Sequence, residues 1–167
     1  MQFLIDRIAS PLGTVLVVSD GECLRALDFE DYEARMHSLL ARQYDQVTLQ
    51  PARDPGGASR AVEAYFAGQF DALDSFPVAS VGTAFQQLVW RQLREIPCGT
   101  TLSYGELAKR IGNPAASRAV GVANGSNPIA IAVPCHRVIG ANGDLTGYGG
   151  GMERKRWLLT HEGALLL

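Results

Sequence analysis

The chain has 167 residues, enough for one domain or two small lobes, and 47% of them are hydrophobic, which is ordinary for a protein that buries a core. No apolar run approaches the ~20 residues of a membrane span, and the first residues lack the basic and apolar regions of a secretory signal. The three cysteines and three histidines show no zinc-ligand spacing, so the sequence predicts a reduced, cytoplasmic protein without a metal site or a membrane partner.

The formal net charge is only −2, but the charged residues are unevenly distributed. Residues 1–79 hold six arginines against twelve acids, whereas residues 80–167 hold nine lysines and arginines against five acids. Binding of phosphates needs a local basic face rather than a basic total. The second half is therefore compatible with a nucleic-acid partner, and chance sampling is the alternative explanation.

The first half reads as a small lobe of strands followed by helices. Strands are expected at residues 2–8, 13–19 and 22–29, joined by turns into an antiparallel meander. A helix is expected over 31–44, a further short strand at 47–49, and a second helix over 58–66. Residues 71–81 read as a linker, which predicts one domain over 1–79 and another over 80–167. Nothing in the first half looks catalytic.

The second half reads as mostly helical, and capping motifs mark where several of the helices begin. Capping boxes begin at Thr83 and Ser103, each followed three residues later by an amide or a carboxylate. Asn113 can cap the next helix, which is expected over residues 115–124 with Pro114 in its first turn. The two short helices across the turn at 112–113 predict a helix-turn-helix, and a closing helix is expected over 152–160.

The second helix of this pair carries almost no side-chain bulk except Arg118. A slim helix can enter the minor groove of DNA, about 6 Å wide, and Arg118 could then fill the base stack where a nucleotide has left it. Close packing of two helices, with a solvated Arg118, is the alternative.

Residues 124–128 read as a turn that leads into a strand carrying Cys135. Residues 133–138 read Val-Pro-Cys-His-Arg-Val and place a thiol beside an imidazole. A free thiol titrates near pH ~8.5 and reacts as the thiolate, so a neighbouring base or positive charge activates it. A buried structural thiol after an apolar run is the alternative for an isolated Cys-His pair.

This string, with matching residues on both sides, resembles the active-site motif of the O6-alkylguanine-DNA alkyltransferases, and the likeness to the bacterial Ogt-type members extends over essentially the whole chain. The resemblance implies an α/β (α+β) fold: a ribonuclease-H-like N-terminal lobe with a three-stranded antiparallel sheet, and a C-terminal helical lobe with a winged-helix-like helix-turn-helix. It implies a catalytic set of Cys135, His136, Glu162 and the hinge residue Asn127. The implied substrate pocket consists of Tyr104, Val138, Tyr148, Gly149 and Gly150, and the implied DNA contacts are Arg118, Tyr104, Ser117 and Asn113.

The function that the resemblance implies is direct-reversal DNA repair. A monomer flips O6-alkylguanine, and possibly O4-alkylthymine, out of double-stranded DNA and transfers the alkyl group irreversibly to Cys135, without a cofactor. The glycines around Tyr148 suggest a pocket open to groups larger than methyl, and backbone turns with positive φ are the alternative reason for these glycines. A lesion sensor with a structural Cys135 and a thiol hydrolase using Cys135 and His136 are the rival functions.

Overall fold

The computed structural model describes residues 1–165 and divides into two compact units. The first contains residues Met1–Val81 and Pro128–Ala132, and the second contains Gly82–Asn127 and the chain from Val133 onward. The division after residue 81 falls two residues beyond the boundary expected from sequence, and the return of residues 128–132 to the first unit was not anticipated. None of the described helices is long and apolar enough to cross a membrane.

The first unit is built on a four-stranded mixed sheet with the order β3-β2-β1-β4. The strands are β1 (Gln2–Ile8), β2 (Val15–Ser19), β3 (Leu24–Phe29) and β4 (Thr48–Pro51). β1, β2 and β3 form the expected antiparallel meander, but β4 adds a fourth strand parallel to β1. The short strand expected at 47–49 is thus present as β4, shifted towards the C-terminus. Its parallel pairing with β1 makes the sheet four-stranded and mixed, where a three-stranded antiparallel sheet was expected.

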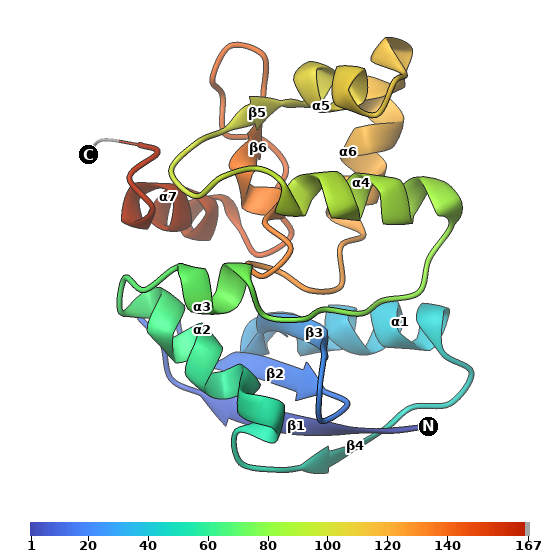
Figure 1. The fold of residues 1–167 in the computed structure, drawn as a ribbon, viewed down its shortest axis with the longest axis vertical. Coiled ribbons are helices and arrows are strands. Elements are labelled where there is room, and N and C mark those ends of the chain that lie inside the picture. The colour runs from blue at the N-terminus through green and yellow to red at the C-terminus, as the bar shows by residue number, and fades with distance from the viewer. Residues whose placement is uncertain (166–167) are drawn as a thin grey trace. The chain divides into compact units, whose positions relative to one another are not determined.

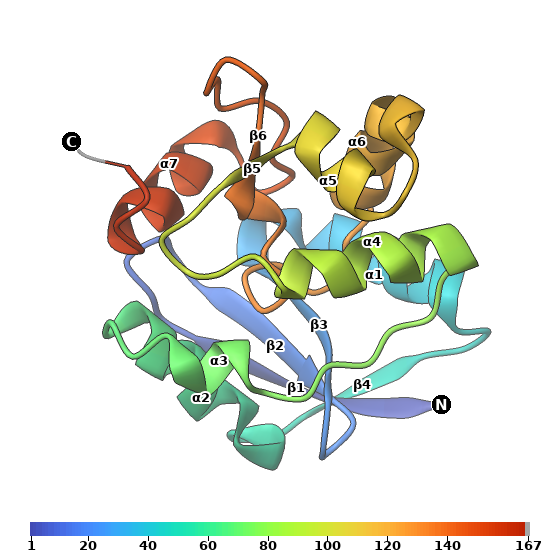
Figure 2. The ribbon, with the colours of Figure 1, turned by 45° about the horizontal axis from the view of Figure 1, so that its top comes forward.

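Helices α1 (Glu33–Gln43) and α2 (Ala58–Phe66) lie on opposite faces of this sheet (Figures 1 and 2). Alternate side chains of a strand point to opposite faces of the sheet, so different residues of the same strands contact α1 and α2. One face packs on α1 in a cluster of buried residues: Phe3, Leu16, Val18, Ala26, Met36, Leu40 and Tyr44. On the other face, Asp6 accepts a 2.7 Å hydrogen bond from Ser59 of α2. Within the predicted linker, residues Asp71–Asp74 form a short helix, α3.

The second unit is mainly helical: α4 (Ala84–Arg94), α5 (Tyr104–Arg110), α6 (Ser117–Gly125) and α7 (Met152–His161). Both predicted capping boxes are present, at Thr83 before α4 and at Ser103 before α5. A short parallel pair, β5 (Leu102–Ser103) and β6 (Val138–Ile139), joins the entry to α5 to the segment that follows the Cys-His motif (Figure 1). The helix-turn-helix and the motif thus share one small sheet.

The entry to α6 differs from the expectation. The Asn113 side chain makes no capping hydrogen bond, and its backbone carbonyl accepts from the Ala116 N–H at 3.0 Å. Residues Pro114–Ala116 form a 3-10 turn, and the α-helix begins only at Ser117. The first turn predicted as helix is therefore tighter than an α-helix, which is common at helix starts.

The run before the motif was expected to be a strand carrying Cys135, and this was wrong. The Ala132 N–H donates to the Ala130 carbonyl at 2.7 Å across Ile131, whose φ is +69°. The Cys135 N–H donates to the Val133 carbonyl at 2.8 Å across Pro134. Such bonds between residues two apart define γ-turns, so the chain bends twice before it enters the 3-10 turn Cys135–Arg137. Positive φ is unusual for a β-branched residue, so Ile131 stores strain in this buried segment.

Candidate active site

Cys135 begins the 3-10 turn Cys135–Arg137 and is a buried cysteine outside any disulfide, with 7% of its surface exposed. The γ-turn at Pro134 fixes the backbone immediately before the sulfur, since proline holds φ near −65° and here has φ −82° and ψ 67°. The nucleophile predicted from sequence therefore lies on a rigid, tightly bent segment. A reactive group held in this way loses little freedom when a substrate arrives.

His136 and Glu162 meet inside the second unit, although 26 residues separate them in sequence. His136 Nε2 lies 2.7 Å from Glu162 Oε2, and both side chains are fully buried. An ionised carboxylate can only accept, so the hydrogen bond assigns the proton of a neutral imidazole to Nε2 and leaves Nδ1 as an acceptor. Nδ1 is buried and has no hydrogen-bond partner among the described residues. This nitrogen is available to take a proton from a neighbouring group.

Arg137 holds the other side of the Glu162 carboxylate. Its Nε donates to Oε1 at 2.8 Å and its Nη2 to Oε2 at 3.1 Å, a two-pronged pairing that fixes the carboxylate plane. Its Nη1 donates to the Ile96 carbonyl at 2.9 Å. Burial acts to raise the pKa of Glu162, but His136 and Arg137 outweigh it and lower the pKa to about 2. Glu162 is therefore ionised at neutral pH despite its burial.

Asn127, predicted as the hinge asparagine, directly precedes residues 128–132, the segment that belongs to the first unit. Its Nδ2 donates to the Val133 carbonyl at 2.8 Å, and the residue is 8% exposed. This hydrogen bond joins the last residue before the segment 128–132 to the first residue after it. Asn127 thus fixes the position of Val133, where the chain returns to the second unit.

Tyr104 opens α5 and donates its hydroxyl to the Thr146 carbonyl at 3.2 Å. Burial raises the pKa of this phenol, a hydrogen bond with Thr146 lowers it, and the charge of a Cys135 thiolate raises it again. The Tyr104 ring also lies beside Gly121 of α6, and Asn124 of the same helix donates to the Cys135 carbonyl at 3.3 Å. Both predicted site residues therefore pack against α6.

The predicted pocket wall is formed by β6 and the loop that follows it. Val138 is fully buried, and the Tyr148 ring meets the His136 ring edge-on with 6.4 Å between centroids. Gly150 is buried and its carbonyl accepts from Arg154 at 3.2 Å, whereas Gly149 is exposed. Of the predicted wall residues, Tyr148 thus contacts the imidazole directly.

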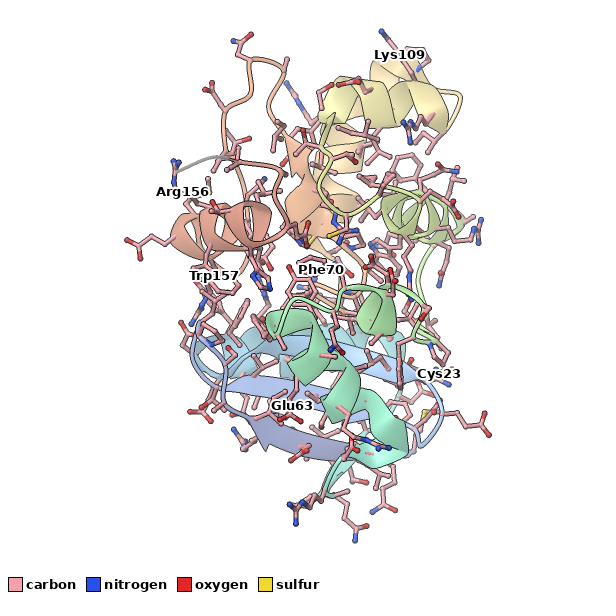
Figure 3. All side chains as sticks on the ribbon, turned by 60° about the vertical axis from the view of Figure 1, so that its left-hand side comes forward. Cys23, Glu63, Phe70, Lys109, Arg156 and Trp157 are labelled. Carbon is pink, nitrogen blue, oxygen red and sulfur yellow. The ribbon has the colours of Figure 1, made fainter. Side chains whose placement is uncertain are left out.

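The predicted DNA contacts lie on or beside α6. Arg118 is exposed on this helix, Ser117 is half-buried at its first position, and Asn113 is exposed before it. Lys109 projects outward from α5 in the same unit (Figure 3). Within residues 1–165, no cluster of three or more His, Cys, Asp or Glu side chains is suited to a metal ion.

Comparisons with known proteins identify the family. Residues 84–164 match the model described as "6-O-methylguanine DNA methyltransferase, DNA binding domain", and residues 6–80 match that of the "ribonuclease-like domain" of the same family. The chain belongs to this family. The family fold confirms the expected ribonuclease-like N-terminal lobe and helical DNA-binding C-terminal lobe.

Full-length relatives and solved structures agree with this family. A methylated-DNA–protein-cysteine methyltransferase from Shigella flexneri is 51% identical over 100% of this chain and 99% of its own length. One from Mycobacterium tuberculosis (strain H37Rv) is 49% identical, over 93% of this chain and 89% of its own. The crystal structure of Mycobacterium tuberculosis OGT in complex with DNA matches with a TM-score of 0.81 and 43% identity, covering 98% of this chain and 94% of that one.

The structure also brings three residues to the site that sequence reasoning did not assign. Arg137 pairs with Glu162, as described above. Lys155, fully buried in α7, donates to the Val138 carbonyl at 2.6 Å and to the Thr146 carbonyl at 2.8 Å. Asn124 of α6 donates to the Cys135 carbonyl at 3.3 Å. Arg137 stood inside the motif and could have been suspected, but a lysine in a helix and an asparagine near a turn carry no sequence signal of burial.

Proposed function

We propose that this protein repairs DNA by transferring the alkyl group of O6-alkylguanine to the sulfur of Cys135. The reaction class is that of a methylated-DNA–protein-cysteine methyltransferase, and full-length relatives of that name support it. The observation that carries the assignment of residues is the buried Cys135, outside any disulfide and followed by His136, whose imidazole is held by Glu162 at 2.7 Å. This is the arrangement of nucleophile, base and orienting acid that activates a thiol.

The proposed transfer begins with loss of the thiol proton. Glu162 keeps the imidazole proton on Nε2, so Nδ1 takes the proton of Cys135 through a water. The thiolate then attacks the alkyl carbon: a carbon–sulfur bond forms while the bond between that carbon and guanine O6 breaks. The electron pair passes to the guanine ring, where the Tyr104 hydroxyl donates a hydrogen bond to the developing negative charge on a ring nitrogen. The product thioether is stable to water, so each molecule reacts once.

The alkylated base must leave the duplex before the sulfur can reach it. Flipping costs a few kcal/mol, and a lesion that pairs badly lowers this cost. The exposed face of α6 carries small residues apart from Arg118 and Val122, a shape that suits the minor groove. In the proposal, Arg118 fills the gap that the flipped nucleotide leaves, while Ser117 and Asn113 contact the neighbouring backbone.

We also propose that the protein acts as a monomer in the cytoplasm and needs no cofactor. Every residue with a proposed chemical role lies on the second unit of a single chain. None of the three cysteines forms a disulfide, and a reducing compartment keeps Cys135 available as a thiol. Groups larger than methyl and O4-alkylthymine are further proposed substrates.

The test is the intact mass of the protein after incubation with an excess of a short duplex that contains one O6-methylguanine. Wild-type protein and the variants Cys23→Ser and Cys98→Ser should each gain one methyl group. Cys135→Ser should gain none while still binding the duplex, because a serine hydroxyl is far less acidic than a thiol.

The rival functions give different outcomes in the same experiment. A lesion sensor binds the duplex and gains no mass. A thiol hydrolase gains no stable methyl group and turns over an activated ester. Methylation of Cys135→Ser, or its loss in both control variants, contradicts the assignment of Cys135.

A further inference from the structure

We propose that Asn124 is a positioning residue for alkyl transfer. Its amide holds the Tyr104 hydroxyl and the Cys135 backbone in one fixed arrangement. Tyr104 is then placed to stabilise the leaving guanine while the Cys135 sulfur attacks the alkyl carbon. The inference rests on the proposed function, because it acts through the roles given there to Tyr104 and Cys135. It concerns a residue of α6 that takes no part in the bond changes of the proposed transfer.

The geometry links Asn124 to both partners. Asn124 lies in the last turn of α6, is 3% exposed, and donates from Nδ2 to the Cys135 carbonyl at 3.3 Å. One turn earlier, a β-carbon built at Gly121 lies 3.9 Å from two ring carbons of Tyr104, so the phenol ring rests against this face of α6. The amide of Asn124 also acts on the hydroxyl, since a hydrogen bond with it lowers the pKa of Tyr104 against the larger effect of burial.

The amide carries a cost to stability. The Oδ1 atom of Asn124 is buried and has no hydrogen-bond partner among the residues that the structure describes. A buried polar atom without a partner costs about 1–3 kcal/mol, whereas an apolar side chain of similar shape avoids that cost. Leucine would serve packing at this position better than asparagine. The amide is therefore explained by its donors, which leucine lacks.

The donors have a specific use in the transfer. Nδ2 carries two hydrogens, one for the Cys135 carbonyl and one for the Tyr104 hydroxyl oxygen. A hydroxyl that accepts a hydrogen bond becomes a better donor. In the free protein that hydroxyl donates to the Thr146 carbonyl at a long 3.2 Å, and the same carbonyl also accepts from Lys155 at 2.8 Å. The hydroxyl can therefore turn to the guanine nitrogen without leaving the Thr146 carbonyl unpaired.

The test compares Asn124→Leu with Ser126→Ala, a half-buried polar residue directly after the same helix. The measurements are the single-turnover methylation rate at saturating duplex, the Kd for the duplex and the Tm. Asn124→Leu should slow methylation about tenfold, since it weakens but does not remove a general-acid contribution of roughly 10²-fold or more. Its Tm should stay equal or rise, and its Kd should change little. Ser126→Ala should retain the wild-type rate.

Two further measurements separate positioning from mere structural support. The rate loss should be smaller with O6-benzyl-8-azaguanine than with O6-benzylguanine, because the more acidic azaguanine depends less on a hydrogen bond as it leaves. In a Tyr104→Phe background, Asn124→Leu should cause little additional loss. Equal losses with both bases, or an undiminished loss in the Tyr104→Phe background, would overturn the proposal.

The outcomes also distinguish this inference from the proposed function. If wild-type protein gains no methyl group at Cys135, the proposed function fails and the inference fails with it. If wild-type protein is methylated and Asn124→Leu reacts at the same rate, only the role of Asn124 is overturned.

Discussion

Glu162 is stable as a buried anion only because two neighbours compensate it. Removing a carboxylate from water is costly, and the cost is met here by the Arg137 guanidinium and by the His136 N–H. One carboxylate thus performs two tasks: it neutralises a fully buried arginine and sets the tautomer of the imidazole. Sequence reasoning assigned only the second task, because the pairing of Arg137 with a residue 25 positions away depends on how the chain folds.

Glu162→Gln should affect reactivity and stability together. An amide is a weaker acceptor for the imidazole proton and leaves Arg137 buried without a counter-charge, so we expect a slower transfer and a loss of about 3–5 kcal/mol in the free energy of unfolding. The measurements are single-turnover methylation and urea unfolding. Glu153→Gln, an exposed acid in the first turn of α7, is the matched control and should change neither quantity.

The pH dependence gives this prediction a second readout. The pKa of Glu162 is lowered from 4.5 to about 2, so its contribution to stability is fully present above about pH 4.5 and is lost as the pH falls through about 2. Wild-type stability should therefore fall more steeply with acid across this window than that of Glu162→Gln. Parallel curves for the two proteins would show that Glu162 is not held ionised by its neighbours.

The elements near the motif show where local sequence patterns succeed and where they fail. The capping boxes at Thr83 and Ser103 were predictable, because they use contacts within four residues. The bends at Ile131 and Pro134 were not, because an apolar run reads as a strand and its positive φ is imposed by tertiary packing. The start of α6 was placed too early because the 3-10 turn Pro114–Ala116 has the composition of a helix.

The exposed face of α6 offers a matched pair of variants, Arg118→Ala and Val122→Ala. Val122 is 69% exposed one turn after Arg118, and it is the bulky apolar residue of that face. A phosphate contact contributes about 0.9 to the slope of log K against log salt, whereas an apolar contact contributes nothing to it. We expect both variants to bind duplex DNA more weakly, and Arg118→Ala alone to change the salt slope if it touches a phosphate.

Reaction with a free base separates binding from chemistry in this pair. O6-benzylguanine needs no flipping, so both variants should react with it at the wild-type rate while repairing a duplex more slowly. An equal loss on both substrates in either variant would show that the residue supports the fold or the pocket instead of the DNA contact.

At the scale of the whole molecule, the sequence was most informative about organisation. The two-lobe division, the ribonuclease-like first lobe and the helical second lobe were all predicted, and the family models match each half. The uneven charge also agrees with a match to a DNA-binding domain over residues 84–164. The parallel pairing of β4 with β1 and the return of residues 128–132 to the first unit were not predicted, because each depends on contacts between distant segments.

Methylation of Cys135 should lower the stability of the whole molecule. Burial lowers the pKa of Lys155 to about 8, and the negative charge of a Cys135 thiolate acts in the opposite direction. To the extent that Cys135 rests as a thiolate, its conversion to a neutral thioether removes the charge that favours the buried ammonium. We expect the methylated protein to have a lower Tm than the unmodified protein at pH 7, measured by calorimetry after reaction with an equimolar duplex and removal of the DNA.

The pH dependence of this difference in Tm follows from the interaction of Lys155 with the Cys135 thiolate. In the unmodified protein Lys155 loses its proton as the pH rises through about 8, and without the thiolate the pKa of Lys155 is lower still in the methylated protein. Above about pH 8 the ammonium is neutral in both forms, so the difference in Tm should shrink. Lys155→Met provides the control, because without the ammonium methylation should change the Tm by less than it does in the wild type. A difference that persists unchanged to pH 9, or one equally large in Lys155→Met, would place the origin of the destabilisation in steric crowding around the added methyl group.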